Sequence, residues 1–140
     1  MRRVIIIIFI VFSGSCILLA QIPDSLKYQS LDPHHFQVQY LTDGNSILID
    51  VREFFEFGRT RIKGAVNIPS SANLEMAADT IDKNASLFLY CYSGTRSKKV
   101  ARFFYDKGFR KLYSLEGGIV LWKKEKMPVE KKRLRRKQGL

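Results

Sequence analysis

Short apolar runs that alternate with helical stretches are the main pattern of the chain. Two runs, 46–51 and 85–91, are apolar at nearly every position, which is typical of parallel strands covered on both faces. Shorter runs within 63–69 and at 111–115 predict two more strands. Helices are expected over 34–41, 53–57, 72–82, 96–107 and from 117 to 122. The alternation predicts an α/β fold, a small, mostly parallel central sheet with helices on both faces.

The two ends of the chain differ from this central part. Residues 2–3 are basic, residues 4–12 apolar and residues 13–15 small, which is the order found in a signal peptide. We therefore expect a leader over 1–20, a polar linker over 21–31, the folded domain over 32–125 and a basic tail over 126–140. Such a leader predicts export to the periplasm or cell envelope of a bacterium.

Three fates of the leader remain open. Cleavage after Ala20 would release a soluble protein in which Cys91 is the sole cysteine and no disulfide can form within the chain. Alternatively, the run Ser13 to Cys16 loosely resembles a lipoprotein cleavage box, with Cys16 as the lipidated residue. The third fate is an uncleaved anchor, since residues 4–20 are close to the shortest apolar segment that crosses a bilayer.

The formal charge of +11 is concentrated at the C-terminal end. Residues 123–140 hold nine Lys or Arg against two Glu, so the rest of the domain is nearly neutral once the leader is removed. We expect no nucleic-acid partner and a monomeric domain. The basic tail is either a solvated terminus or a contact for an anionic membrane surface.

The segment from Cys91 to Arg96 joins the end of a predicted strand to the start of a helix. Ligands of open parallel sheets bind outside the carboxyl ends of the strands. Backbone amides at a helix N-terminus, together with the flexible Gly94 and the charge of Arg96, favour an anion there. Cys91 is thus expected to act as a thiolate nucleophile, with hydrogen bonds from the hydroxyls of Ser93 and Thr95. Cys91 as a buried space-filling residue, and Arg96 in a surface ion pair, are the alternatives.

Several other polar residues have simpler interpretations. Asp50 and Arg52 are expected to support the site as an ion pair or loop brace at a strand end. Glu53 and Glu56 are interpreted as a solvated helix face. His34 and His35 are adjacent in the sequence, so they cannot share one helix face as metal ligands. No metal site and no cofactor are expected.

Four motifs in order resemble the rhodanese-like sulfurtransferases and together span about residues 32–122. They are residues 48–58 with Asp50-Val51-Arg52-Glu53, residues 62–69 with Gly64-Ala65, the loop Cys91-Tyr92-Ser93-Gly94-Thr95-Arg96-Ser97, and Glu116-Gly117-Gly118-Ile119 with Trp122. Arg61 stands where many family members have His. The resemblance implies a small parallel α/β fold and a catalytic Cys91. It also implies that the loop Tyr92, Ser93, Gly94, Thr95 and Arg96 binds the transferred sulfur.

The resemblance implies transfer of sulfane sulfur from a donor such as thiosulfate or a persulfide to cyanide or a thiol. A non-catalytic interaction module and an envelope thiol-redox protein are the competing hypotheses. A phosphatase of related fold would have its arginine six positions after the cysteine, whereas Arg96 is five positions after Cys91. The loop length therefore argues against phosphatase chemistry.

Overall fold

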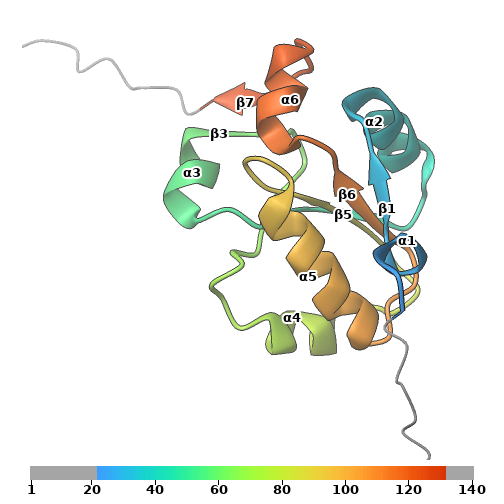
Figure 1. Ribbon diagram of the computed structural model, residues 1–140. Coiled ribbons are helices and arrows are strands. Elements are labelled where there is room, and N and C mark those ends of the chain that lie inside the picture. Colours follow the sequence, from blue (N-terminus) through green and yellow to red (C-terminus); the bar gives the residue numbers. More distant parts are fainter. Residues whose placement is uncertain (1–21, 132–140) are drawn as a thin grey trace, which may run out of the picture.

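A five-stranded sheet forms the centre of the computed structural model, which describes residues 22–131 (Figure 1). All its neighbouring strands are parallel, in the order β1-β6-β5-β2-β4. The strands are β1 Gln29–Leu31, β2 Ser46–Asp50, β4 Val66–Asn67, β5 Ser86–Tyr90 and β6 Leu112–Leu115. The predicted α/β fold with a parallel sheet is confirmed. The expected leader, Cys16 and the end of the tail lie outside the described residues.

Six helices are present in the described part of the chain. They are α1 Asp24–Lys27, α2 Pro33–Thr42, α3 Phe54–Arg59, α4 Leu74–Thr80, α5 Thr95–Asp106 and α6 Gly118–Lys124. All five expected helices are found, with ends that differ by a few residues. For example, α2 begins at Pro33 because the Asp32 carboxylate accepts hydrogen bonds from the amides of His34 and His35.

Helices cover both faces of the sheet, as predicted (Figure 1). Alternate side chains of the fully buried β5 point to opposite faces. Leu87 and Leu89 pack with residues of α4 and α5 in one core cluster. Phe88 and Tyr90 pack with residues of α2 and α6 in the other. This double coverage explains why the strand is apolar at almost every position.

The segment expected as a linker over 21–31 instead contributes to the fold. Within it, β1 pairs in parallel with β6, and Asp24 of α1 forms an ion pair with Arg102 of α5. The sequence pattern did not reveal β1 because it is an edge strand of three residues, and Gln29 and Ser30 are exposed. The folded domain therefore begins before Asp32.

The first residues of the expected basic tail also pack on the domain. A second small sheet joins β3 Thr60–Arg61 to β7 Glu130–Lys131 in antiparallel register. Met127 is buried, and the indole Nε1 of Trp122 donates to the carbonyl oxygen of Pro128 over 2.9 Å. The domain therefore extends past residue 125. Between residues 22 and 131, no helix combines the length and apolar character that a membrane crossing requires.

Candidate active site

Cys91 directly follows β5, at the carboxyl edge where the sequence predicted it. Cys91 is 1% exposed, and its sulfur accepts a hydrogen bond from the amide of Gly94 over 3.1 Å. The neighbouring strand β2 ends at the same level, since Asp50 is in register with Tyr90. The thiol thus lies under its own loop, at the edge of the sheet where ligands of parallel α/β folds bind.

Gly94 shapes the loop and is the residue that precedes α5. Its φ of +93° lies in the left-handed region, which glycine adopts without a steric cost. A Cβ at this position would lie 3.3 Å from the carbonyl oxygen of Leu115 and 3.4 Å from the amide nitrogen of Gly117. Both neighbours are backbone atoms, so the left-handed φ favours glycine at this position and a side chain would also have little room.

The first turn of α5 contains amides that remain available to a ligand. The first bond of the helix runs from the amide of Lys98 to the carbonyl oxygen of Gly94. Among the residues described, no oxygen accepts from the amides of Thr95, Arg96 or Ser97, as is usual for the first turn of a helix. These amides are therefore hydrogen-bond donors that an anion in the loop could use.

Helix α6 holds the same loop from the other side. The amide of Ile119 donates to the carbonyl oxygen of Cys91 over 2.9 Å, and that of Val120 donates to Tyr92 over 3.2 Å. Such close contact requires Gly118, because a Cβ there would lie 2.5 Å from both carbonyl oxygens. The Gly117-Gly118 pair therefore has a structural role in the site that the sequence reasoning did not assign.

Two buried serine hydroxyls lie behind the sulfur. The Oγ of Ser97 is 3.7 Å from Cys91 Sγ, and it donates to the carbonyl oxygen of Gly94 over 3.0 Å. The Oγ of Ser114, on β6, is 2.9 Å from that of Ser97. These contacts fix the loop on its inner side. Ser114 is distant in sequence, so only the fold reveals this contact.

Arg96 forms a two-pronged ion pair with Glu56 of α3. Its Nη1 and Nη2 donate to the two carboxylate oxygens over 3.0 and 3.1 Å. The interpretation of Glu56 as part of a solvated face was wrong, since its side chain is only 18% exposed. The structure instead shows the alternative in which Arg96 forms an ion pair. Arg96 thus connects the loop to α3 rather than offering an uncompensated charge.

The electrostatics of this pair favour its charged form. Burial alone would raise the pKa of Glu56, but hydrogen bonds from Arg96 and from the Glu53 amide lower it. The hydrogen bond to Glu56 in turn raises the pKa of Arg96. Both groups are therefore ionised at neutral pH.

Asp50 and Arg52 form a buried ion pair, as predicted for a brace. Asp50 is 0% exposed and Arg52 is 3% exposed. Nε of Arg52 donates to both Asp50 oxygens over 3.0 and 3.1 Å, and Nη2 also donates to the carbonyl oxygen of Thr60. Burial would lower the pKa of Arg52, but the hydrogen bonds to Asp50 raise it. The pair holds the end of β2 next to β3.

The remaining loop residues face outward. Tyr92, Ser93 and Thr95 are exposed, and the hydroxyls of Ser93 and Thr95 lie 3.3 Å apart. Among residues 22–131, no three His, Cys, Asp or Glu side chains gather as metal ligands would. The chemical groups available at the site are thus a buried sulfur, backbone amides and exposed hydroxyls.

Comparison with known proteins gives the same picture as the motifs. A family model described as "Rhodanese-like domain" matches residues 37–125. Among solved structures, a rhodanese-related protein from Thermoplasma volcanium has a TM-score of 0.65 and 27% identity, covering 74% of this chain and 98% of that chain. The rhodanese-like domain of an Anabaena protein has a TM-score of 0.66 at 20% identity, covering 79% and 86%; this second likeness concerns the fold alone.

The curated relatives are longer proteins. The chain is 28% identical over 112 residues to a tRNA uridine(34) hydroxylase of Yersinia pestis, covering 71% of this chain and 32% of that protein. The hydroxylase of Hamiltonella defensa is 29% identical over 126 residues, covering 77% and 35%. The chain thus spans about a third of the length of these relatives.

Proposed function

Since the chain belongs to the family of rhodanese-like domains, we propose that it is a sulfurtransferase in which Cys91 carries sulfane sulfur as a persulfide. The proposed donor is a small anion such as thiosulfate, or a persulfide, and the acceptor is a thiol or cyanide. The observation that carries the proposal is the hydrogen bond from the Gly94 amide to Cys91 Sγ. A donor at this position stabilises a negatively charged sulfur.

Two displacements account for the transfer. The Cys91 thiolate attacks the outer sulfur of thiosulfate, a new S–S bond forms, and the old S–S bond breaks with its electron pair leaving on sulfite. The thiolate of the acceptor then attacks the outer sulfur of the Cys91 persulfide. That S–S bond breaks, the electron pair returns to Cys91, and the acceptor leaves as a persulfide. No external oxidant or reductant is required.

The surrounding groups have separate roles in this proposal. The open amides of Thr95, Arg96 and Ser97 would bind the outer sulfur of the persulfide, which bears negative charge. Arg96, paired with Glu56, acts as a positioning residue that holds the loop against α3. The Asp50–Arg52 pair supports the neighbouring strand end.

The sulfur chemistry is proposed to take place outside the cytoplasm. The pattern of residues 1–20 supports export, either as a soluble protein cleaved after Ala20 or as a lipid-anchored or membrane-anchored one. We further propose a monomer with no nucleic-acid partner. The hydroxylation of tRNA named for the relatives is not transferred to this chain, because they extend over about three times its aligned length.

The proposal is tested by sulfur transfer from thiosulfate to cyanide and to a dithiol. The wild-type protein should form thiocyanate or release sulfide, and Cys91→Ser should form neither. Equal turnover by Cys91→Ser would overturn the proposal. A non-catalytic module predicts no turnover by either protein, whereas a thiol-redox protein predicts mixed disulfides of Cys91 without transfer.

A further inference from the structure

A basic hollow lies next to the loop that carries Cys91. Its volume is about 270 Å³, and it is lined by Ser93, Gly94, Thr95, Lys98, Lys99 and Arg102. Ser93 and Gly94 belong to the loop, and Thr95 is the first residue of α5. The three basic residues lie one or two turns further along that helix. The hollow is thus built partly from the segment that surrounds the sulfur.

The cations around this hollow differ in whether their charge is compensated. Arg102 is held by Asp24, with Nε donating to its two oxygens over 2.9 and 3.0 Å. Lys98 and Lys99, in contrast, have no carboxylate within ion-pair distance among residues 22–131. Of the uncompensated positive charges on α5, those of Lys98 and Lys99 therefore lie nearest to the loop.

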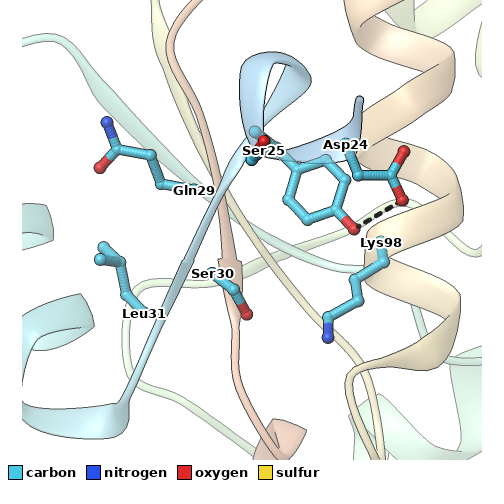
Figure 2. Close-up of a pocket in the computed structure, with 7 residues that line it drawn as sticks. Asp24, Ser25, Gln29, Ser30, Leu31 and Lys98 are labelled. Atoms are coloured by element: carbon cyan, nitrogen blue, oxygen red, sulfur yellow. Dashed lines mark hydrogen bonds between the residues drawn. The ribbon is translucent and has the colours of Figure 1, made fainter. Parts of the chain in front are cut away.

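Lys98 also borders a second hollow of about 450 Å³. Figure 2 shows Lys98 in the lining of this hollow, together with Ser30 of β1 and Asp24 of α1. The Asp24 carboxylate is already bound by Arg102 and by the hydroxyl of Tyr28, which lies 3.4 Å from its Oδ2. The acidic group of this hollow is thus already bound by Arg102 and Tyr28, and Lys98 forms no ion pair within residues 22–131.

We propose that Lys98 and Lys99 bind the anionic group of the sulfur acceptor, and that this acceptor is an organic thiol bearing a carboxylate. The inference rests on the proposed function, because it names the substrate class of the same site. The hydroxyls of Ser93 and Thr95 add hydrogen-bond donors to the wall of the same hollow. Exposed ammonium groups attract such an anion from solution and position it.

The position of the lysines favours an organic acceptor over an inorganic ion. Lys98 and Lys99 follow the first residue of α5 by three and four positions, or about 4.5–6 Å along the helix axis. The sulfonate oxygens of thiosulfate are only two bonds from its outer sulfur. In this proposal, an organic thiol that separates its carboxylate from its sulfur by several bonds spans the distance from the loop to the lysines.

The test measures how fast small thiols remove sulfur from the Cys91 persulfide after loading with thiosulfate. 3-Mercaptopropionate, 2-mercaptoethanol and cysteamine are similar in size but carry a negative, neutral and positive group. The wild-type protein should react fastest with the anionic thiol at equal thiolate concentration. In the double variant Lys98→Ala/Lys99→Ala, the preference for the anionic thiol should be about five- to tenfold smaller. Added salt should reduce the same preference in the wild-type protein.

The control is Lys123→Ala/Lys124→Ala, which removes the same charge from exposed positions of α6 and should retain the preference. Equal charge preference in the wild type and the Lys98/Lys99 variant would overturn the inference while the sulfurtransferase proposal stands. Slower loading from thiosulfate with unchanged discharge would assign the lysines to the donor and would also overturn it. Failure of the wild-type protein to load any sulfur would instead contradict the proposed function.

Discussion

Helices α5 and α6 both begin at the carboxyl edge of the sheet behind a left-handed glycine, but their first amides have different partners. At α6, the amides of Ile119 and Val120 donate to carbonyl oxygens of the Cys91 loop. At α5, the amide of Gly94 donates to the sulfur itself. One helix start therefore holds the loop in shape, whereas the other faces the chemistry.

A helix N-terminus therefore provides a binding site only when its hydrogen-bond donors are left available. The amides of Ile119 and Val120 are occupied by the carbonyl oxygens of the loop, and Gly118 permits this contact by lacking a side chain. The amides that follow Gly94 have no acceptor among the described residues, so they can bind a charged sulfur.

The largest effect is expected from Gly118→Ala, which breaks the supporting side. Its φ is +58°, and the new Cβ would lie 2.5 Å from the carbonyl oxygens of Cys91 and Tyr92. We expect a loss of roughly 3 kcal/mol or more of unfolding free energy, with loss of sulfur transfer. Urea unfolding followed by circular dichroism measures it.

Gly58→Ala provides the matched control for that variant. A Cβ at Gly58 meets nothing within 4 Å, and the residue lies inside α3. Alanine there should leave stability unchanged or slightly raised. If both variants unfolded at the same urea concentration, the close approach of α6 to the loop would have no energetic importance.

Gly94→Ala tests the side that faces the sulfur and should affect activity more than folding. The left-handed φ costs a non-glycine residue about 1–2 kcal/mol. A shift of the loop away from Leu115 would also misplace the amide that contacts Cys91, which should lower the rate of sulfur transfer about tenfold or more. Stability and turnover are compared on one preparation; a fall in stability without any fall in turnover would contradict this assignment.

Glu56→Gln probes the ion pair that positions Arg96 and should have a smaller effect. We expect a loss of about 1 kcal/mol at neutral pH, because the pair is partly shielded from solvent and two-pronged. Glu75→Gln is the control at the other end of α5, where Glu75 pairs with Lys107 and is 56% exposed. Its effect should be smaller still.

The same pair predicts a pH dependence of stability. The pKa of Glu56 is lowered from 4.5 in the folded protein, so its contribution is complete above that value and is lost as pH falls through the folded pKa. The difference in unfolding free energy between wild type and Glu56→Gln should therefore shrink in acid. A difference that grew below pH 4.5 would contradict the assignment.

Much of the fold could be predicted because its central strands are continuous apolar runs. Residues 46–51 and 85–91 are short apolar runs in a chain where such runs alternate with helical stretches, and this pattern predicts buried parallel strands. The edge strand β1 and the two-residue strands β3 and β7 could not be found in this way. Their side chains are partly or fully exposed, so no apolar pattern marks them.

The site was only partly predictable for a related reason. The placement of Cys91 and Gly94 follows from residues close in sequence, namely a strand, a glycine and a helix start. The partner of Arg96 is forty residues away in Glu56, and the contact of Ser97 with Ser114 joins α5 to β6. Such pairings depend on how the strands are ordered in the sheet, which local spacing does not determine.

Whether Cys91 carries the transferred sulfur is measured by the intact mass of the protein before and after incubation with thiosulfate. The wild-type protein should gain one sulfur atom and lose it to a thiol acceptor, and Cys91→Ser should gain none. The same spectrum reports whether the mature chain begins at Gln21. A wild-type protein that stays unmodified with every sulfur donor, or a Cys91→Ser variant that gains the same mass, would show that Cys91 is not the sulfur carrier.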